Sequence, residues 1–138
     1  MGDAVDTYVR TIYDAFNARE MDRLMGYLAE DVCWEEQVAP PDGGIFEGRA
    51  AVRAHVFDRL LTEWKDFHIE PEEIDVMGSV AIVTGRWRGE HLETGTVMEE
   101  PFCHVWTVEE GRVTRLKHIT DPEVMQRVWK QARQAETL

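Results

Sequence analysis

The chain is poor in cysteine, and its acidic residues far outnumber its basic ones. Cys33 and Cys103 are the only cysteines among 138 residues, which predicts a reduced pair rather than a disulfide. Lysine and arginine number 15 against 27 aspartates and glutamates, so the formal net charge is −12. This charge disfavours nucleic acid and anionic membrane as partners, because both would repel the protein surface.

Long apolar runs and cofactor motifs are missing as well. No stretch approaches the roughly 20 apolar residues that a membrane span requires. The first six residues lack the basic segment and following apolar segment of a secretory signal, so we expect a cytoplasmic protein. No His or Cys pair has the short spacing of a metal site, and Gly43-Gly44 opens no phosphate-binding pattern. We therefore expect neither a metal nor a cofactor.

The residues that are present predict one domain over 1–138. Apolar residues make up 43% and charged residues 30% of the chain, which is an ordinary globular mixture. Helical spacing of apolar residues predicts a first helix from Val5 to Phe16, a shorter one from Met21, and a third over about 49–64. The period then changes to that of strands. Strands are predicted over 32–37, 67–76, 80–88, 96–108 and 112–119, and a last helix over about 123–135.

This order of elements predicts an α+β fold. Long antiparallel strands need one face covered, and three N-terminal helices can cover it. We expect a strongly curved antiparallel sheet packed on those helices, with a short C-terminal helix. A sheet curved in this way leaves a cone, and its open end is the natural place for a pocket.

Four stretches of the sequence carry a family resemblance. They are Phe16-Asn17-Ala18-Arg19-Glu20-Met21 leading to Leu28-Ala29-Glu30-Asp31-Val32-Cys33-Trp34-Glu35-Glu36, then Phe46-Glu47-Gly48-Arg49-Ala50-Ala51-Val52, Pro101-Phe102-Cys103-His104-Val105-Trp106, and Glu110-Gly111-Arg112-Val113-Thr114-Arg115-Leu116 ending at Asp121. Together they resemble the nuclear-transport-factor-2-like superfamily, and within it the SnoaL-like polyketide cyclases and the ketosteroid isomerases. The resemblance implies the cone-shaped fold and a homodimer formed by the outer sheet face. It is weak for any one reaction, because this fold hosts many functions.

The resemblance also implies candidate catalytic residues. The isomerases place a carboxylate base at the end of the first strand, where Glu36 stands. Their oxyanion site uses a Tyr on the first helix and an Asp on the penultimate strand. Ile12 and Cys103 stand at those positions, with Tyr13 one residue off, so that pair is not recognisable. The cyclases use a carboxylate that closes the last strand as acid/base, and Asp121 stands there.

Alternation along the strands predicts which side chains share the pocket with Glu36. His118 should lie on the pocket side of the last strand, so that the cavity holds a carboxylate and an imidazole. His104 and Trp106 should point to the outer face, where we expect them at a dimer interface. The predicted substrate-binding residues are Ile12, Phe16, Trp34, Trp87, Cys103, Val105, Leu116 and Thr120. The two tryptophans among them would serve equally well as core residues.

Each catalytic candidate has a structural alternative. If the register shifts by one residue, Glu35 faces the pocket instead of Glu36. His118 could be a structural histidine, and Asp121 is fully explained as the cap of the last helix. Cys103 suits a small wall residue better than a nucleophile, because no base is evident beside it.

Two functions follow from this set of residues. The first is a cofactor-free enzyme that shifts a proton on a small, largely apolar molecule, driving isomerisation, cyclisation, dehydration or epoxide opening. Glu36 would be its general base, with His118 as acid partner or orienter. The second is a non-catalytic module of the same fold that binds a small molecule or a partner chain.

Overall fold

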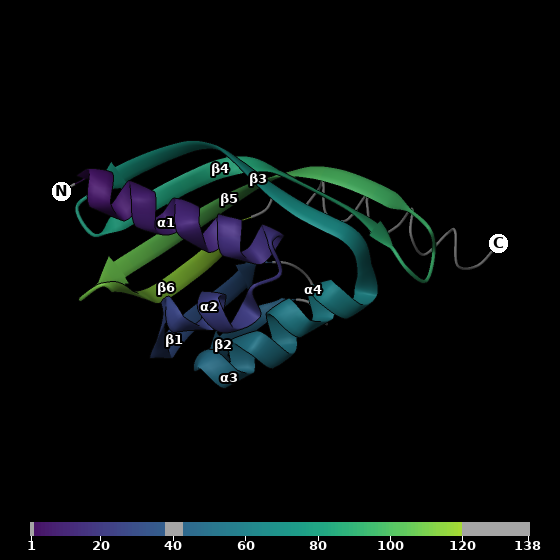
Figure 1. The fold of residues 1–138 in the computed structure, drawn as a ribbon, viewed down its shortest axis with the longest axis horizontal. Helices are drawn as coiled ribbons and strands as arrows, with labels where there is room; N and C mark the ends of the chain where they lie inside the picture. The colour runs from purple at the N-terminus through teal and green to yellow at the C-terminus, as the bar shows by residue number, and fades with distance from the viewer. Residues whose placement is uncertain (1, 38–42, 120–138) are drawn as a thin grey trace.

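The structure is a computed structural model that describes residues 2–37 and 43–119. Six strands form one curved, open sheet in the order β2-β1-β6-β5-β4-β3 (Figure 1). All neighbouring strands are antiparallel except β1 and β6, which run parallel. The strands are β1 (Leu28–Gln37), β2 (Gly44–Glu47), β3 (Trp64–Met77), β4 (Val80–His91), β5 (Val97–Glu109) and β6 (Arg112–Ile119). The predicted α+β class and curved sheet are confirmed.

The helices lie before and between the first strands, as predicted. Helix α1 (Gly2–Asn17) lies along one face of the sheet and contacts β3 and β4 (Figure 1). A short α2 (Met21–Gly26) follows, and the third helical segment joins α3 (Arg49–Val52), a π-helical turn (Arg53–Phe57) and α4 (Asp58–Glu63). The amphipathic spacing of α1 buries Val9, Ile12, Tyr13 and Phe16 against the sheet, because residues three and four apart share one helix face.

The bounds of some elements differ from the prediction, because they depend on hydrogen bonds between strands that lie far apart in the sequence. Strand β1 begins at Leu28, and α2 ends at Gly26, because the Tyr27 carbonyl accepts a hydrogen bond from Val113 N and Leu28 pairs with Val113. Residues Gly44–Glu47 form a further short strand, β2, which pairs with β1. The C-terminal helix predicted over 123–135 lies outside the described residues.

Strand β3 bends sharply along the sheet edge. Its pairing with β4 shifts register near Pro71, and such bulges bend a strand. Pro71 is tolerated because β3 is an edge strand. At the same point a side chain on Gly85 would stand 2.1 Å from the Glu70 carbonyl oxygen, so only glycine fits. The Asn17 side chain donates to the Ile69 carbonyl at 2.8 Å and accepts from Ile69 N at 3.0 Å, tying the end of α1 to this bend.

Candidate active site

A carboxylate and an imidazole meet where β1 and β6 run side by side. The parallel register sets Glu36 beside His118, and His118 Nδ1 lies 2.5 Å from Glu36 Oε2. The other carboxylate oxygen, Oε1, accepts a hydrogen bond from Trp34 Nε1 at 2.7 Å. The two side chains are only 14% and 16% exposed. His118 Nε2 is buried and has no hydrogen-bond partner among the residues that the structure describes.

The neighbouring carboxylate lies on the opposite face of β1. Glu35 Oε2 accepts a hydrogen bond from Gln37 Nε2 at 2.7 Å and lies 3.9 Å from Lys117 Nζ. Side chains alternate along a strand, so Glu35 and Glu36 cannot both face inward. Of the two registers left open by the sequence, the structure has the one with Glu36 inside.

A second polar group is buried beside this pair, and sequence reasoning missed it. The Tyr13 hydroxyl lies 2.7 Å from His104 Nδ1 and accepts a hydrogen bond from Trp106 Nε1 at 2.9 Å. Tyr13, His104 and Trp106 are 3%, 8% and 2% exposed. His104 pairs across the strands with His118, and their ring centroids are 4.7 Å apart. The Tyr13 group and the Glu36–His118 pair are therefore neighbours on the inner sheet face.

The predicted orientation of β5 is wrong by one residue. His104 and Trp106, expected on the outer face, point inward, whereas Cys103 and Val105, expected in the pocket, are partly exposed on the other face. A one-residue shift moves every side chain of a strand to the opposite face. Both faces of β5 carry apolar residues, so alternation alone did not select one. The large rings at every second position, Phe102, His104 and Trp106, were the available signal.

Of the remaining predicted pocket residues, some are buried in the core and the others lie outside the described part of the chain. Ile12, Phe16, Trp34 and Leu116 are buried on the inner side, with at most 4% exposure. Trp87 is buried in a separate aromatic group, stacked on Phe67 with ring centroids 5.1 Å apart and edge-on to Trp64 at 5.5 Å. Thr120 and Asp121 lie outside the described residues.

Burial controls the ionisation of the inner groups. It lowers the pKa of His104 well below its usual value, and the nearby His118 lowers it further. Burial raises the pKa of the Tyr13 hydroxyl far above its ordinary value and also raises the pKa of the Cys103 thiol. His104 is therefore neutral at physiological pH, Tyr13 stays a hydroxyl, and Cys103 lacks the depressed pKa of a reactive cysteine.

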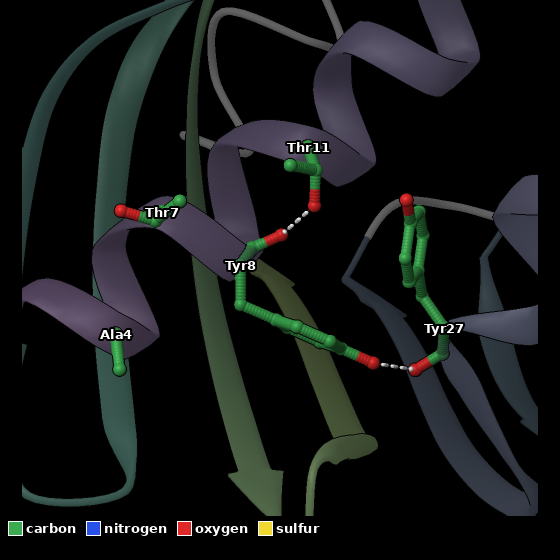
Figure 2. Close-up of a pocket in the computed structure, with 5 residues that line it drawn as sticks. All are labelled: Ala4, Thr7, Tyr8, Thr11 and Tyr27. Atoms are coloured by element: carbon green, nitrogen blue, oxygen red, sulfur yellow. Dashed lines mark hydrogen bonds between the residues drawn. The ribbon is translucent and has the colours of Figure 1, made fainter.

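A hollow of about 580 Å³ opens on a different face of α1 (Figure 2). It is lined by Ala4, Thr7, Tyr8, Thr11 and Tyr27, and the Tyr8 hydroxyl donates to the Tyr27 carbonyl at 2.7 Å. None of the described residues that line it carries a charge, and its hydroxyls at Tyr8 and Thr11 already bond to backbone carbonyls. The hollow therefore has fewer groups that could bind a ligand or transfer a proton than the inner face of the sheet.

In the described part of the chain, no group of three or more His, Cys, Asp or Glu side chains is arranged to hold a metal ion. None of the described helices is long and apolar enough to cross a membrane.

Comparison with known proteins gives the family. The model of the SnoaL-like domain matches residues 9–116, which include Tyr13, Glu36 and His104. The chain belongs to the SnoaL-like family. Among curated proteins, no sequence matches it significantly.

Solved structures show the same fold as this SnoaL-like domain. An NTF2-like protein of unknown function from Burkholderia pseudomallei is 27% identical, with a TM-score of 0.77 over 89% of this chain and 95% of that one. A protein from Xanthomonas campestris pv. campestris, to which polyketide cyclase activity has been attributed, is 20% identical, with a TM-score of 0.80 over 95% and 98%. A ketosteroid isomerase-like fold from Catenulispora acidiphila, in complex with trimethylamine, is 13% identical, with a TM-score of 0.73 over 83% and 85%.

Proposed function

We propose that this SnoaL-like domain is an enzyme that moves a proton on a small, largely apolar organic molecule, with Glu36 and His118 as its catalytic pair. One observation carries the proposal. His118 Nδ1 is bonded to a carboxylate at 2.5 Å, while its Nε2 is buried without a partner among the described residues. Leaving a buried polar atom unpaired costs roughly 1–3 kcal/mol, so such an atom deserves a functional explanation.

The geometry favours His118 as the group that exchanges the proton. When Nδ1 donates to the Glu36 carboxylate, the neutral ring carries its proton on Nδ1 and presents a lone pair at Nε2. Glu36 then fixes the ring orientation and stabilises the imidazolium that forms, as a carboxylate behind a catalytic histidine does. This assignment reverses the emphasis of the sequence expectation, in which Glu36 was the general base.

The chemistry open to such a pair is proton removal from one atom and return to another. Isomerisation, cyclisation, dehydration and epoxide opening all need this step, and the two side chains can perform it without a cofactor. A neighbouring fold binds trimethylamine, and another has been linked to polyketide cyclisation, which supports a small organic substrate. Asp121, outside the described residues, stays a predicted third acid/base group.

Exchange of carbon-bound protons in heavy water tests the proposal without knowledge of the natural substrate. A panel of cyclic ketones and β-diketones is incubated with the protein, and loss of the α-proton signals is followed by proton NMR. We expect the wild-type protein to accelerate exchange for part of the panel. His118→Gln should lower that rate by about 10²- to 10⁴-fold, the usual contribution of a general base, and Glu36→Gln should lower it because the ring loses its orienting carboxylate.

Glu35→Gln is the matched control, since it makes the same change one residue away on the opposite face. We expect its exchange rate to stay within about twofold of wild type, as for surface substitutions in general. Equal rates in His118→Gln and wild type would contradict the proposed role.

A non-catalytic binding module is the second candidate. It is favoured by the burial of Trp34 and Trp87, which are 4% and 8% exposed and pack against other aromatic rings. Absence of wild-type exchange across the whole panel would support it. A homodimer in the cytoplasm stays a prediction for both candidates, and sedimentation at micromolar concentration checks the dimer. Its interface cannot use the buried rings of His104 and Trp106.

A further inference from the structure

The Trp34 side chain connects the aromatic core to the Glu36–His118 pair. Trp34 and Glu36 are two residues apart on β1, so both side chains lie on the inner face of the sheet. The indole Nε1–H, which can only donate, bonds to Glu36 Oε1 at 2.7 Å. The other oxygen, Oε2, faces His118 Nδ1 at 2.5 Å. Each oxygen of the carboxylate therefore has its own donor, and the two donors together fix the orientation of the carboxylate.

Two aromatic rings hold the Trp34 indole in this position. Trp34 is 4% exposed. Phe57 meets it edge-on with ring centroids 5.3 Å apart and planes at 74°, and Trp106 meets it on β5 at 5.6 Å and 86°. These are favourable distances and angles for aromatic pairs. Rotation of the indole away from Glu36 would break both contacts, so the packing directs the N–H at the carboxylate.

Phe57 reaches Trp34 from the π-helical turn Arg53–Phe57. This turn lies between α3 and α4, and its hydrogen bonds join residues five apart, so it accommodates one residue more than an α-helical turn. Such turns are frequent at functional sites. Phe57 is 5% exposed and also packs against Phe16 of α1, with ring centroids 5.8 Å apart. The π-helical turn therefore supplies the ring that supports Trp34 from the helical side.

We propose that Trp34 is a positioning residue of the catalytic pair, whose indole N–H holds Oε1 of Glu36 so that Oε2 stays on His118 and the carboxylate keeps its charge. A hydrogen bond to the charged form of a carboxyl group favours that form. The neutral His118 ring keeps its proton on Nδ1, and its lone pair on Nε2, only while Glu36 accepts that proton's hydrogen bond. The inference rests on the proposed function, and it names a residue that controls how readily the pair takes up a proton.

Loss of the indole N–H has a defined chemical consequence. The Glu36 carboxylate would keep only the donor from His118, and uptake of a proton by the pair becomes more favourable, because it neutralises a buried charge. The added proton can lie on the Glu36 carboxyl group or on an imidazolium ring. In both arrangements Nε2 of His118 carries a hydrogen and has no lone pair. The pair is then unable to act as a base.

The other titratable groups near Trp34 and Glu36 are retained in the variants that remove the N–H. Among the described residues they are His118 on β6, His104 on β5, Tyr13 on α1, and His55, whose ring stacks on Phe46 beside Trp34. Glu35 and Lys117 lie on the opposite face of the sheet. A change of pH dependence that follows removal of the N–H is therefore assigned to the Glu36–His118 pair.

The pH dependence of proton exchange tests this role. Trp34→Phe removes the N–H and keeps an aromatic ring. We expect its exchange rate at saturating ketone and neutral pH to fall by about tenfold or more, the usual worth of a hydrogen bond to a charged group. The rate rises with pH as the pair loses its proton, and this rise should move to higher pH by about one unit or more. The KM should stay within about twofold of wild type, because the N–H bonds to Glu36 and not to the substrate.

Two further proteins separate the N–H from the size of the ring. Site-specific benzothienylalanine at position 34 replaces the N–H by sulfur and keeps the double ring, so it should show the same movement of the pH profile as Trp34→Phe. Trp64→Phe is the matched control, since it makes the same change in a separate aromatic group, edge-on to Trp87 at 5.5 Å. Its pH profile should coincide with that of wild type.

Proton NMR of the indole groups tests the bond without requiring turnover. The chain has five tryptophans, and the indole N–H resonance that disappears in Trp34→Phe belongs to Trp34. It should move upfield in Glu36→Gln, because the acceptor loses its charge and the bond weakens. It should stay in place in Glu35→Gln, which makes the same change on the opposite face. A Trp34 resonance at the same position in wild type and Glu36→Gln would overturn the proposal.

The outcomes separate this proposal from the proposed function. If His118→Gln stops exchange while loss of the Trp34 N–H lowers the rate without moving the pH profile, the enzyme assignment stands and the positioning role of Trp34 is wrong. If Trp34→Phe does not fold, the benzothienylalanine protein supplies both the resonance assignment and the pH profile. If the wild-type protein catalyses no exchange, the proposed function fails, and the Trp34 resonance in Glu36→Gln still decides whether the indole holds the carboxylate.

Discussion

Replacing Tyr13 by phenylalanine removes a single oxygen atom from the protein interior. That oxygen accepts the Trp106 N–H at 2.9 Å and bonds to His104 Nδ1 at 2.7 Å. The phenylalanine ring keeps the same volume otherwise, so the packing against Phe102 and Trp106 is retained. Two buried polar groups are left without a partner, and the substitution therefore isolates the energetic value of this hydrogen-bonded group.

The size of the effect follows from those two unpaired groups. Each buried donor or acceptor that loses its partner costs about 1–3 kcal/mol, so Tyr13→Phe should lower the free energy of unfolding by about 2–6 kcal/mol. A domain of this size has about 5–15 kcal/mol in total. At about 4 °C per kcal/mol for a chain of intermediate length, the melting temperature should fall by about 8 °C or more.

Urea unfolding followed by circular dichroism measures the loss, with Tyr27→Phe as the matched control. Among the described residues, the Tyr27 hydroxyl takes part in one exposed hydrogen bond, which it accepts from Arg23 Nε at 2.8 Å, so its removal should change the free energy of unfolding by at most about 0.5 kcal/mol. The urea dependence, which reports the surface exposed on unfolding, should be the same in all three proteins. A Tyr13→Phe midpoint equal to that of Tyr27→Phe would contradict this prediction, because it would mean that the Trp106 and His104 nitrogens lose no stabilising hydrogen bond.

Two further predictions concern His104 and the closely packed Gly85. Because the folded-state pKa of His104 lies well below its unfolded value of about 6.5, below that pH the unfolded chain binds a proton there that the folded chain does not. The free energy of unfolding should therefore fall on acidification by up to about 1.4 kcal/mol per pH unit from this residue, until the folded-state pKa is reached. His104→Gln should lack this component, and parallel stability–pH curves for the two proteins would contradict it. Gly85→Ala should lower the free energy of unfolding by about 3 kcal/mol, since its methyl group would overlap the Glu70 carbonyl oxygen at 2.1 Å. Gly26→Ala is the control, because no atom lies within 4 Å of the added carbon, and it should change the free energy of unfolding by about 1 kcal/mol or less. Similar unfolding midpoints in the two variants would contradict the prediction, since they would show that the backbone of β3 near Glu70 moves to accommodate the methyl group of Gly85→Ala.

The candidate site was predictable in part because Glu36 and His118 both lie in strands that the local sequence pattern predicts. Glu36 lies one residue before the end of a strand whose alternation and flanking turn residues are visible in the sequence, and His118 lies in a strand bounded by the Glu110-Gly111 turn. What was missed, the Tyr13–His104–Trp106 group, depends on β5. That strand has apolar side chains on both faces, so the alternation of apolar and polar residues does not distinguish inside from outside, and only the size of the alternate rings does.

Local spacing in the sequence was enough to predict the α+β class, the order of the elements apart from β2, and one carboxylate and one imidazole on strands that could meet. These features depend on residues close together in the chain, whose spacing encodes helix or strand. The tertiary structure decided the rest. The bond between Glu36 and His118 spans 82 positions and the bond between Tyr13 and His104 spans 91, so both require a particular strand register and helix placement. A one-residue shift would turn each of these strand side chains to the opposite face, so the side chains that point inward are decided by how β1, β5 and β6 pair in the folded chain.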